Sequence, residues 1–176
     1  SAAMAISLYD ISIASYRQTV GATIAVLEKG RQHCSSAGID LDEIVQTRLH
    51  PDMLPFSFQV HSVVHHSLGA IEGVVSGRFG PPRDLPDLDY RGLQRKLGEA
   101  LDRIEAYTPE QVNGHEGGDV VFGIGDRQIP FTAAGFLLSF SLPNLHFHAA
   151  TAYDILRMKG VPLGKRDYMG QMQIKG

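Results

Sequence analysis

The amino-acid sequence predicts an all-α protein: a four-helix bundle with one short β-hairpin before the last bundle helix. Apolar residues recur at helical spacing in four long segments, and their period changes to two in one segment near residue 120. The connections between the long segments have lengths that suit antiparallel neighbours. No internal repeat or domain boundary interrupts the pattern, so we expect one domain over residues 4–176. Residues 1–3, ahead of Met4, resemble an expression scar.

The first half of the chain predicts two long helices and one short helix. An apolar stripe at helical spacing predicts a first helix of about 25 residues that ends in the breaker run "SSAG"; its members are Tyr9, Ile13, Tyr16, Val20, Leu27 and Cys34. Asp40 is placed to cap a short helix through "LDEIVQTRL", which ends at "HPDMLP". The second long helix is predicted from about Pro55 to Arg78. It stops in the proline-rich connector "FGPPRDLPD", for which we expect no regular structure.

The second half predicts a helix, a hairpin and a last helix. Residues 90–107 keep one apolar and one charged face, which is typical of an amphipathic helix. Apolar residues alternate from Val120 to Phe131 on both sides of a Gly-Asp pair, which predicts a β-hairpin on a tight turn. The last bundle helix is predicted from about Pro143 to Met158, with Gly160 just past its end. Residues 161–176 show no periodicity and should fold back over the bundle.

Composition narrows the class of partners. The chain has 176 residues, is 43% apolar and 20% charged, and carries a net charge of −3. Its lysines and arginines are scattered, so we expect no nucleic-acid partner. No apolar run approaches the roughly 18 residues of a membrane span, so we expect no membrane partner. The single cysteine, Cys34, cannot form an internal disulfide, which favours a cytoplasmic location.

The placement of the histidines points to a metal site. His61 and His65 lie four residues apart on the second helix, so both rings project from one side of it. His148, in "PNLHFHAATAYDILR", points with the apolar residues of the last helix. It needs a hydrogen-bond partner or a metal there, because an unpaired buried polar group costs about 1–3 kcal/mol. If the two helices are neighbours, His65 and His148 could share a divalent ion, with His61 or water completing its shell. Zinc, nickel or iron(II) suits such ligands.

A metal-free explanation fits the same histidines. His61 and His65 fall at the margin of the helix's apolar stripe, where polar residues commonly flank a buried face. His66 follows His65 directly and therefore points about 100° away from it, so it is not assigned to the same site. Asn144, four residues before His148, is a candidate hydrogen-bond partner for that ring.

Two segments carry a resemblance to a known family. "LHPDMLPFSFQV", followed by "PNLHFHAATAYDILRMKGVPLGKRDYMG", resembles an uncharacterised bacterial family, a domain of unknown function in the DinB/YfiT-like superfamily of metalloenzymes. The resemblance covers the chain from Met4 onward. It implies a four-helix bundle, often dimeric, in which many members bind a divalent metal through three histidines, one on the second helix and two spaced four apart on the last. Some members are metal-dependent thiol transferases or thiol-linked isomerases.

When the three-histidine metal site of the superfamily is carried over to this sequence residue by residue, only part of it is present. His65 takes the place of the ligand on the second helix and His148 that of the first ligand on the last helix, but the remaining ligand falls at Ala152. The leading hypothesis is a divalent-metal-dependent enzyme with thiol-transferase-like chemistry and with His61, His65 and His148 at the metal. The alternatives are a non-catalytic homodimeric bundle whose histidines are structural, with no cofactor, and a small-molecule-binding module. The sequence identifies no catalytic residue and no substrate.

Overall fold

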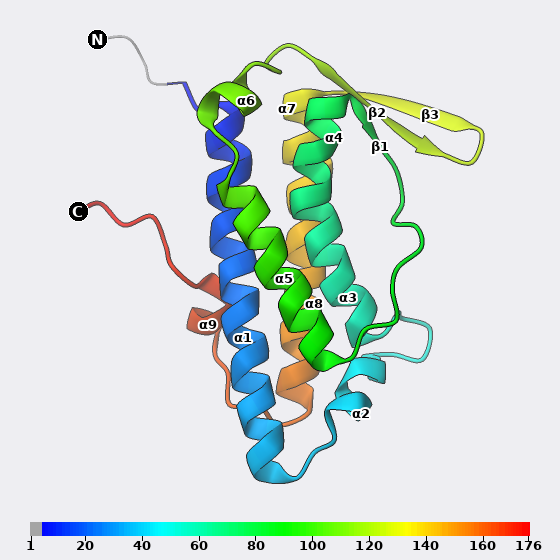
Figure 1. Ribbon diagram of the computed structural model, residues 1–176, viewed down its shortest axis with the longest axis vertical. Coiled ribbons are helices and arrows are strands. Elements are labelled where there is room, and N and C mark those ends of the chain that lie inside the picture. The colour runs from blue at the N-terminus through cyan, green and yellow to red at the C-terminus, as the bar shows by residue number, and fades with distance from the viewer. Residues whose placement is uncertain (1–4) are drawn as a thin grey trace.

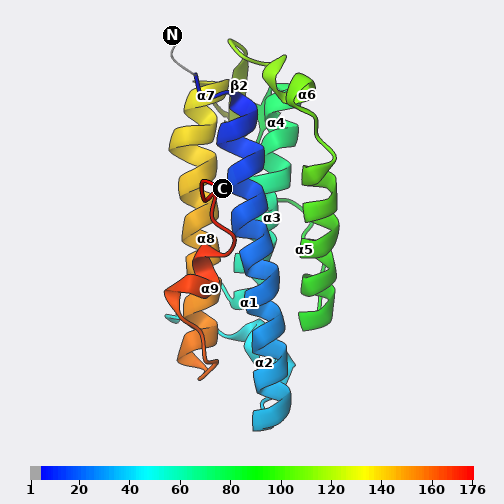
Figure 2. The same cartoon turned by 90° about the vertical axis from the view of Figure 1, so that its left-hand side faces the viewer.

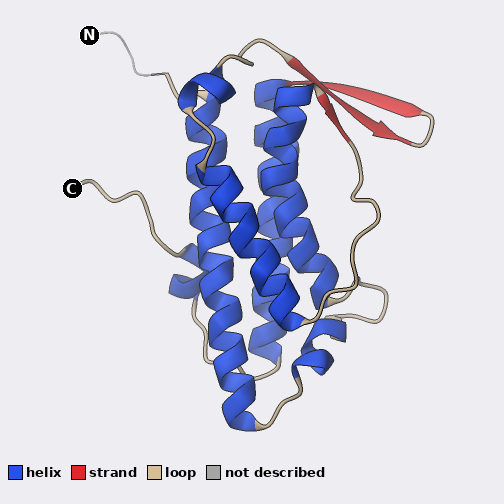
Figure 3. Cartoon of the chain, viewed as in Figure 1, coloured by secondary structure: helices blue, strands red, loops and turns tan. Residues whose placement is uncertain are grey.

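The computed structural model describes residues 5–176; residues 1–4, which include the predicted expression scar, lie outside this part. Four long helical segments form an elongated bundle, and helix dominates the chain (Figures 1 and 3). The all-α bundle predicted from the sequence is therefore confirmed. In chain order the four segments are η1 (Asp10–Ala14) with α1 (Ser15–Ala37); α3 (Phe56–Val64), η2 (His65–Gly69) and α4 (Ala70–Ser76); α5 (Tyr90–Glu105); and α7 (Ala133–Phe136), η3 (Leu137–Ser141) and α8 (Leu142–Met158).

The second and third bundle helices run parallel to each other, whereas the connection lengths suggested antiparallel neighbours. His61 and Glu72 on the second helix contact Lys96 and Arg103 on α5, respectively, so both helices advance in the same direction. The proline-rich connector makes this arrangement possible because it runs back along the bundle from β1 to the start of α5 (Figure 1). Ten extended residues span roughly 33 Å, which is enough for that return.

Three of the four bundle helices contain a π-helical turn, η1, η2 or η3. Such a turn accommodates one extra residue and leaves backbone groups that need other partners. In η2 the carbonyl of His66 accepts a hydrogen bond from Ser141 Oγ of η3 at 2.8 Å. Ser141 Oγ also pairs with Tyr16 OH of α1 at 2.6 Å, and all three residues are buried. This chain of contacts ties three helices together beside the histidines.

The last bundle helix begins ten residues before its predicted start. Thr132 caps it, because its Oγ1 accepts a hydrogen bond from the backbone N–H of Gly135 at 3.0 Å. Pro143 was expected near the first turn of this helix, but it lies inside the continuous segment, two residues after the end of η3. A proline has no N–H to donate, and the π turn before it disturbs the regular ladder at that point.

A three-stranded sheet packs at one end of the bundle. β2 (Asp119–Ile124) and β3 (Arg127–Thr132) pair in antiparallel fashion and are joined by Gly125 and Asp126. The predicted hairpin is therefore confirmed. The predicted second helix ended at about Arg78 and the irregular connector began at Phe79, but the helix ends at Ser76 and both residues form β1 (Arg78–Phe79). β1 pairs in parallel with β2, with Phe79 opposite Phe122. β1 positions Phe79 against His65, with a distance of 4.5 Å between the centroids of the two rings.

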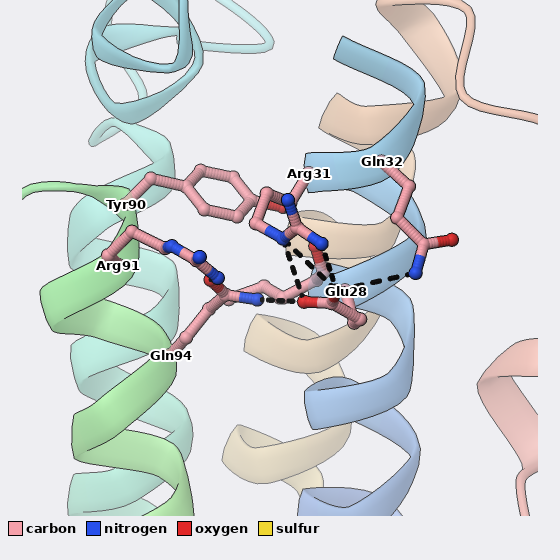
Figure 4. Close-up of polar contacts among 7 residues, drawn as sticks. Glu28, Arg31, Gln32, Tyr90, Arg91 and Gln94 are labelled. Atoms are coloured by element: carbon pink, nitrogen blue, oxygen red, sulfur yellow. Dashed lines mark hydrogen bonds and ion pairs between the residues drawn. The ribbon is translucent and has the colours of Figure 1, made fainter. Parts of the chain in front are cut away.

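Polar contacts join α1 to α5 on another face of the bundle. Glu28 accepts hydrogen bonds from Arg31, Gln32 and Gln94, and Tyr90 OH donates to the carbonyl of Leu27 at 2.6 Å (Figure 4). The bonds from Arg31, and next that from Gln94, lower the pKa of Glu28 to about 2. Because Glu28 is near solvent, this network orients the helices more than it stabilises them.

The C-terminal segment folds back over the bundle, as predicted. It also forms a short helix, α9 (Lys165–Met169), that was not predicted and that lies beside α1 and α8 (Figure 2). Lys29 pairs with Asp167 at 2.6 Å, and Gln18 donates to the carbonyl of Met169 at 2.8 Å. The remaining short helices are α2 (Leu41–Gln46), which Asp40 caps as predicted, and α6 (Pro109–Asn113). No helix within residues 5–176 combines the length and the hydropathy that crossing a bilayer requires.

Candidate functional site at the histidine cluster

Three imidazole rings gather where η2 packs against the last bundle helix. The ring centroid of His66 lies 5.2 Å from that of His65 and 5.5 Å from that of His148. The His66 and His148 rings are nearly parallel, with an interplanar angle of 6°. The neighbouring segments α3 and α8 pack along each other, so the adjacency of the second and fourth helices that the metal hypothesis required is present. We call His65, His66 and His148 the histidine cluster.

The protonation of His148 follows from its contact with Gln59. The side-chain nitrogen of Gln59 donates to the carbonyl of Leu54 at 3.0 Å, which directs the amide oxygen toward His148. That oxygen lies 2.7 Å from His148 Nδ1. Because an amide oxygen only accepts, Nδ1 of His148 carries the proton and Nε2 keeps a lone pair. The predicted partner, Asn144, instead donates to the carbonyl of Phe140.

His65 is fixed in the opposite tautomer. Its Nε2 lies 2.7 Å from the carbonyl oxygen of Gly80, so Nε2 donates and Nδ1 keeps the lone pair. Gly69 leaves this Nδ1 uncovered, since a Cβ at residue 69 would lie 3.3 Å from it. Nδ1 has no hydrogen-bond partner among the described residues and is not fully buried, and His65 lines a surface groove. His65 therefore offers an accessible acceptor.

His66 is the member of the cluster that was not predicted from the sequence. Its side chain is 7% exposed, and its Nδ1 is the one buried side-chain nitrogen or oxygen within residues 5–176 that has no hydrogen-bond partner. Such an atom costs about 1–3 kcal/mol of desolvation. No hydrogen bond to the described residues fixes the orientation of the His66 ring, which is held by packing against neighbouring rings.

His61 lies in a different set of contacts. Its Nε2 donates to the carbonyl of Pro86 at 3.1 Å, and its Nδ1 accepts from Lys96 Nζ at 2.6 Å. Both ring nitrogens are thus engaged, and the residue is 4% exposed. The structure therefore brings together two of the three predicted metal ligands, His65 and His148, and holds His61 against the connector and α5.

Burial keeps the clustered rings neutral at physiological pH. Desolvation, with smaller effects of the neighbouring histidines, lowers the pKa of His66 to about 3 and that of His148 to about 4. The pKa of His65 is lowered for the same main reason, partly offset by its bond to the Gly80 carbonyl. Neutral imidazoles have the lone pairs that metal binding or general base catalysis requires.

An aromatic cover accounts for this desolvation. Phe79 of β1 contacts His65, and its ring centroid lies 5.9 Å from that of His66. Phe140 of η3 lies against His66 at 5.7 Å, and Phe58 and Phe147 meet His148 edge to face at 5.9 and 5.1 Å. The short strand β1 therefore has a function in the site, because it places the ring that shields two of the three histidines.

The donor set fits a metal in chemistry but not in its present geometry. Within residues 5–176, no three His, Cys, Asp or Glu side chains converge on a common point at metal-binding distances. The lone pairs of His65 and His148 are nevertheless set by hydrogen bonds from their other ring nitrogens, as is usual for metal-ligating histidines.

Two residues of the site escaped the sequence analysis, His66 and Gln59. They lie seven residues apart and hence on one face of a helix, which was the available signal. Gln59 interrupts the apolar stripe of the second helix, and a buried amide needs partners. The π turn at His65–Gly69 could not be read from periodicity.

Comparison with a solved structure defines the class of this bundle. The chain resembles a DinB family member protein from Shewanella denitrificans with a TM-score of 0.80 and 23% sequence identity, over 96% of this chain and 95% of that one. The protein therefore has a DinB-like fold. The family described as "Domain of unknown function (DUF1993)" matches residues 8–169, and the chain belongs to that family. A comparison with curated proteins gives no match.

Proposed function

We propose that the histidine cluster binds one divalent metal ion and that the protein is a metal-dependent enzyme. The observation that carries the proposal is the pair of fixed tautomers, which leaves a lone pair on Nδ1 of His65 and on Nε2 of His148. His66 supplies the third imidazole, and water completes the shell. When bound, the metal would act as a Lewis acid or lower the pKa of a coordinated water or thiol.

The chain's own residues prepare this site. The amide of Gln59 and the carbonyl of Gly80 hold the rings of His148 and His65 in orientation, as outer-shell partners do in metal centres. Burial lowers the pKa values of the three rings, so no proton has to leave before a cation binds at neutral pH. Zinc, nickel and iron(II) are the ions that imidazole ligands favour.

Elemental analysis of protein purified without a nickel column tests the proposal. About one divalent ion per chain is expected in the native protein, and none in His65→Ala or His148→Ala. The matched control is His61→Ala, which removes a histidine whose nitrogens are both engaged and should retain the metal. A protein that holds no ion after soaking with zinc, nickel or iron(II) would contradict the proposal.

A second candidate function has its own support. Because no three ligands converge in the described residues, the cluster also suits a non-catalytic bundle whose histidines serve packing and hydrogen bonding. In that case His148→Ala would lower the melting temperature of a protein that never contained metal. The same set of variants thus separates the two functions.

A further inference from the structure

A groove separates the second bundle helix from the sheet, beside the histidine cluster. It has a volume of about 620 Å³, which is in the range of small-molecule sites. The helix η2–α4 forms one wall, and β1, the start of the connector and the β-hairpin form the rest. His65 lines the groove together with two arginines, Arg78 of β1 and Arg83 of the connector.

The groove carries surplus positive charge. Arg78 and Arg83 are both exposed, and neither forms an ion pair or a side-chain hydrogen bond with any residue from 5 to 176. The carboxylate that lines the groove, Glu72, is paired with Arg103 of α5 and is therefore already neutralised. Two free guanidinium groups in a concave site favour an anionic ligand, since guanidinium matches carboxylate and phosphate in geometry.

Glycines allow β1 to lie close to its neighbours beside the groove. A Cβ at Gly73 would lie 3.1 Å from the Phe79 ring, and one at Gly80 would lie 3.1 Å from the carbonyl oxygen of Gly123. A Cβ at Gly69 would approach His65 Nδ1 to 3.3 Å. The absence of these side chains lets β1 approach the helix closely and leaves His65 Nδ1 exposed as an acceptor. A ligand donor that reaches the groove can therefore bind to His65.

We infer that this groove binds a small organic anion that carries a carboxylate or phosphate for Arg78 and Arg83 and a hydroxyl or amine donor for His65 Nδ1. Gln128 of β3 lines the same groove and offers a neutral amide to the ligand. The inference rests on the groove, its free arginines and the exposed nitrogen of His65. A metal at the histidine cluster would take the lone pair of His65 Nδ1, so the ligand's contact to that nitrogen belongs to the metal-free protein, whereas its contacts to Arg78 and Arg83 do not depend on a metal.

Calorimetric titration of protein that has been stripped of metal with EDTA and then dialysed free of EDTA tests the inference separately from metal binding. Three probes share one carbon skeleton: glycerol 3-phosphate, glycerate and uncharged glycerol. At least one anion is expected to bind in the millimolar range, and glycerol is not. Whichever anion binds identifies the ligand class as phosphate ester or carboxylate. Failure of both anions to bind, or equal binding of glycerol, would overturn the inference.

Variants locate the binding site. The double variant Arg78→Gln/Arg83→Gln should weaken anion binding about tenfold or more. Arg127→Gln is the matched control, because it removes one charge from the same sheet but does not line the groove. Gly69→Ala provides a second test. Residue 69 has a helical φ of −60°, so alanine folds there without strain, yet its Cβ would crowd His65 Nδ1 and weaken binding. Unchanged affinity in both groove variants would contradict the assignment.

Discussion

At the scale of single residues, the unpartnered His66 gives the site a measurable pH dependence. Burial lowers its pKa from 6.5 in the unfolded chain to about 3 in the folded protein. Between these values the unfolded state binds a proton that the folded state does not. The free energy of unfolding is therefore highest above pH 6.5 and falls as the pH drops below it, by up to about 1.4 kcal/mol per pH unit from this ring.

We predict that His66→Leu folds stably at neutral pH. Its free energy of unfolding should change less with pH than that of the native protein. The variant removes the buried Nδ1 without a partner and should raise the free energy of unfolding at pH 7 by about 1 kcal/mol. Urea unfolding of metal-free protein at about one pH unit above and one pH unit below the ordinary histidine pKa of 6.5 measures both effects. If the free energy of unfolding changed equally with pH in the variant and the native protein, His66 would not be buried in its neutral form.

At the scale of the elements, the π turns depend on the hydroxyl chain that joins Tyr16, Ser141 and the carbonyl of His66. We predict that Ser141→Ala costs about 1–3 kcal/mol of unfolding free energy, because it leaves two buried polar groups unpaired. Tyr16→Phe should cost less, since Ser141 keeps its bond to the His66 carbonyl. The control is Ser139→Ala, an exposed serine in the same π turn.

The double variant Tyr16→Phe/Ser141→Ala distinguishes a coupled chain from independent contacts. Its loss of unfolding free energy, measured in urea, should be smaller than the sum of the two single losses, because removing either hydroxyl breaks one shared bond. Additive losses, or a neutral Ser141→Ala, would mean that the hydroxyl chain does not hold the π turns in place.

At the scale of the whole molecule, periodicity predicted the bundle and the hairpin but not how they assemble the site. The apolar stripes mark which face of each helix is buried, so the four long segments and the inward direction of His148 were readable from the sequence. The return of the connector along the bundle was not, because a proline-rich segment has no period. That return supplies the carbonyl of Gly80 to His65 and the carbonyl of Pro86 to His61. These contacts decide which histidines keep free nitrogens.

The most direct test of the account is a zinc titration of EDTA-stripped protein, followed through the side-chain ¹⁵N resonances of the histidines. We predict saturation at one zinc per chain, with large shifts for His65 and His148, a shift for His66 as its ring turns, and none for His61, whose nitrogens are held by Pro86 and Lys96. Absence of saturable binding, or zinc-dependent shifts that exclude His65 and His148, would contradict a metal site at the histidine cluster.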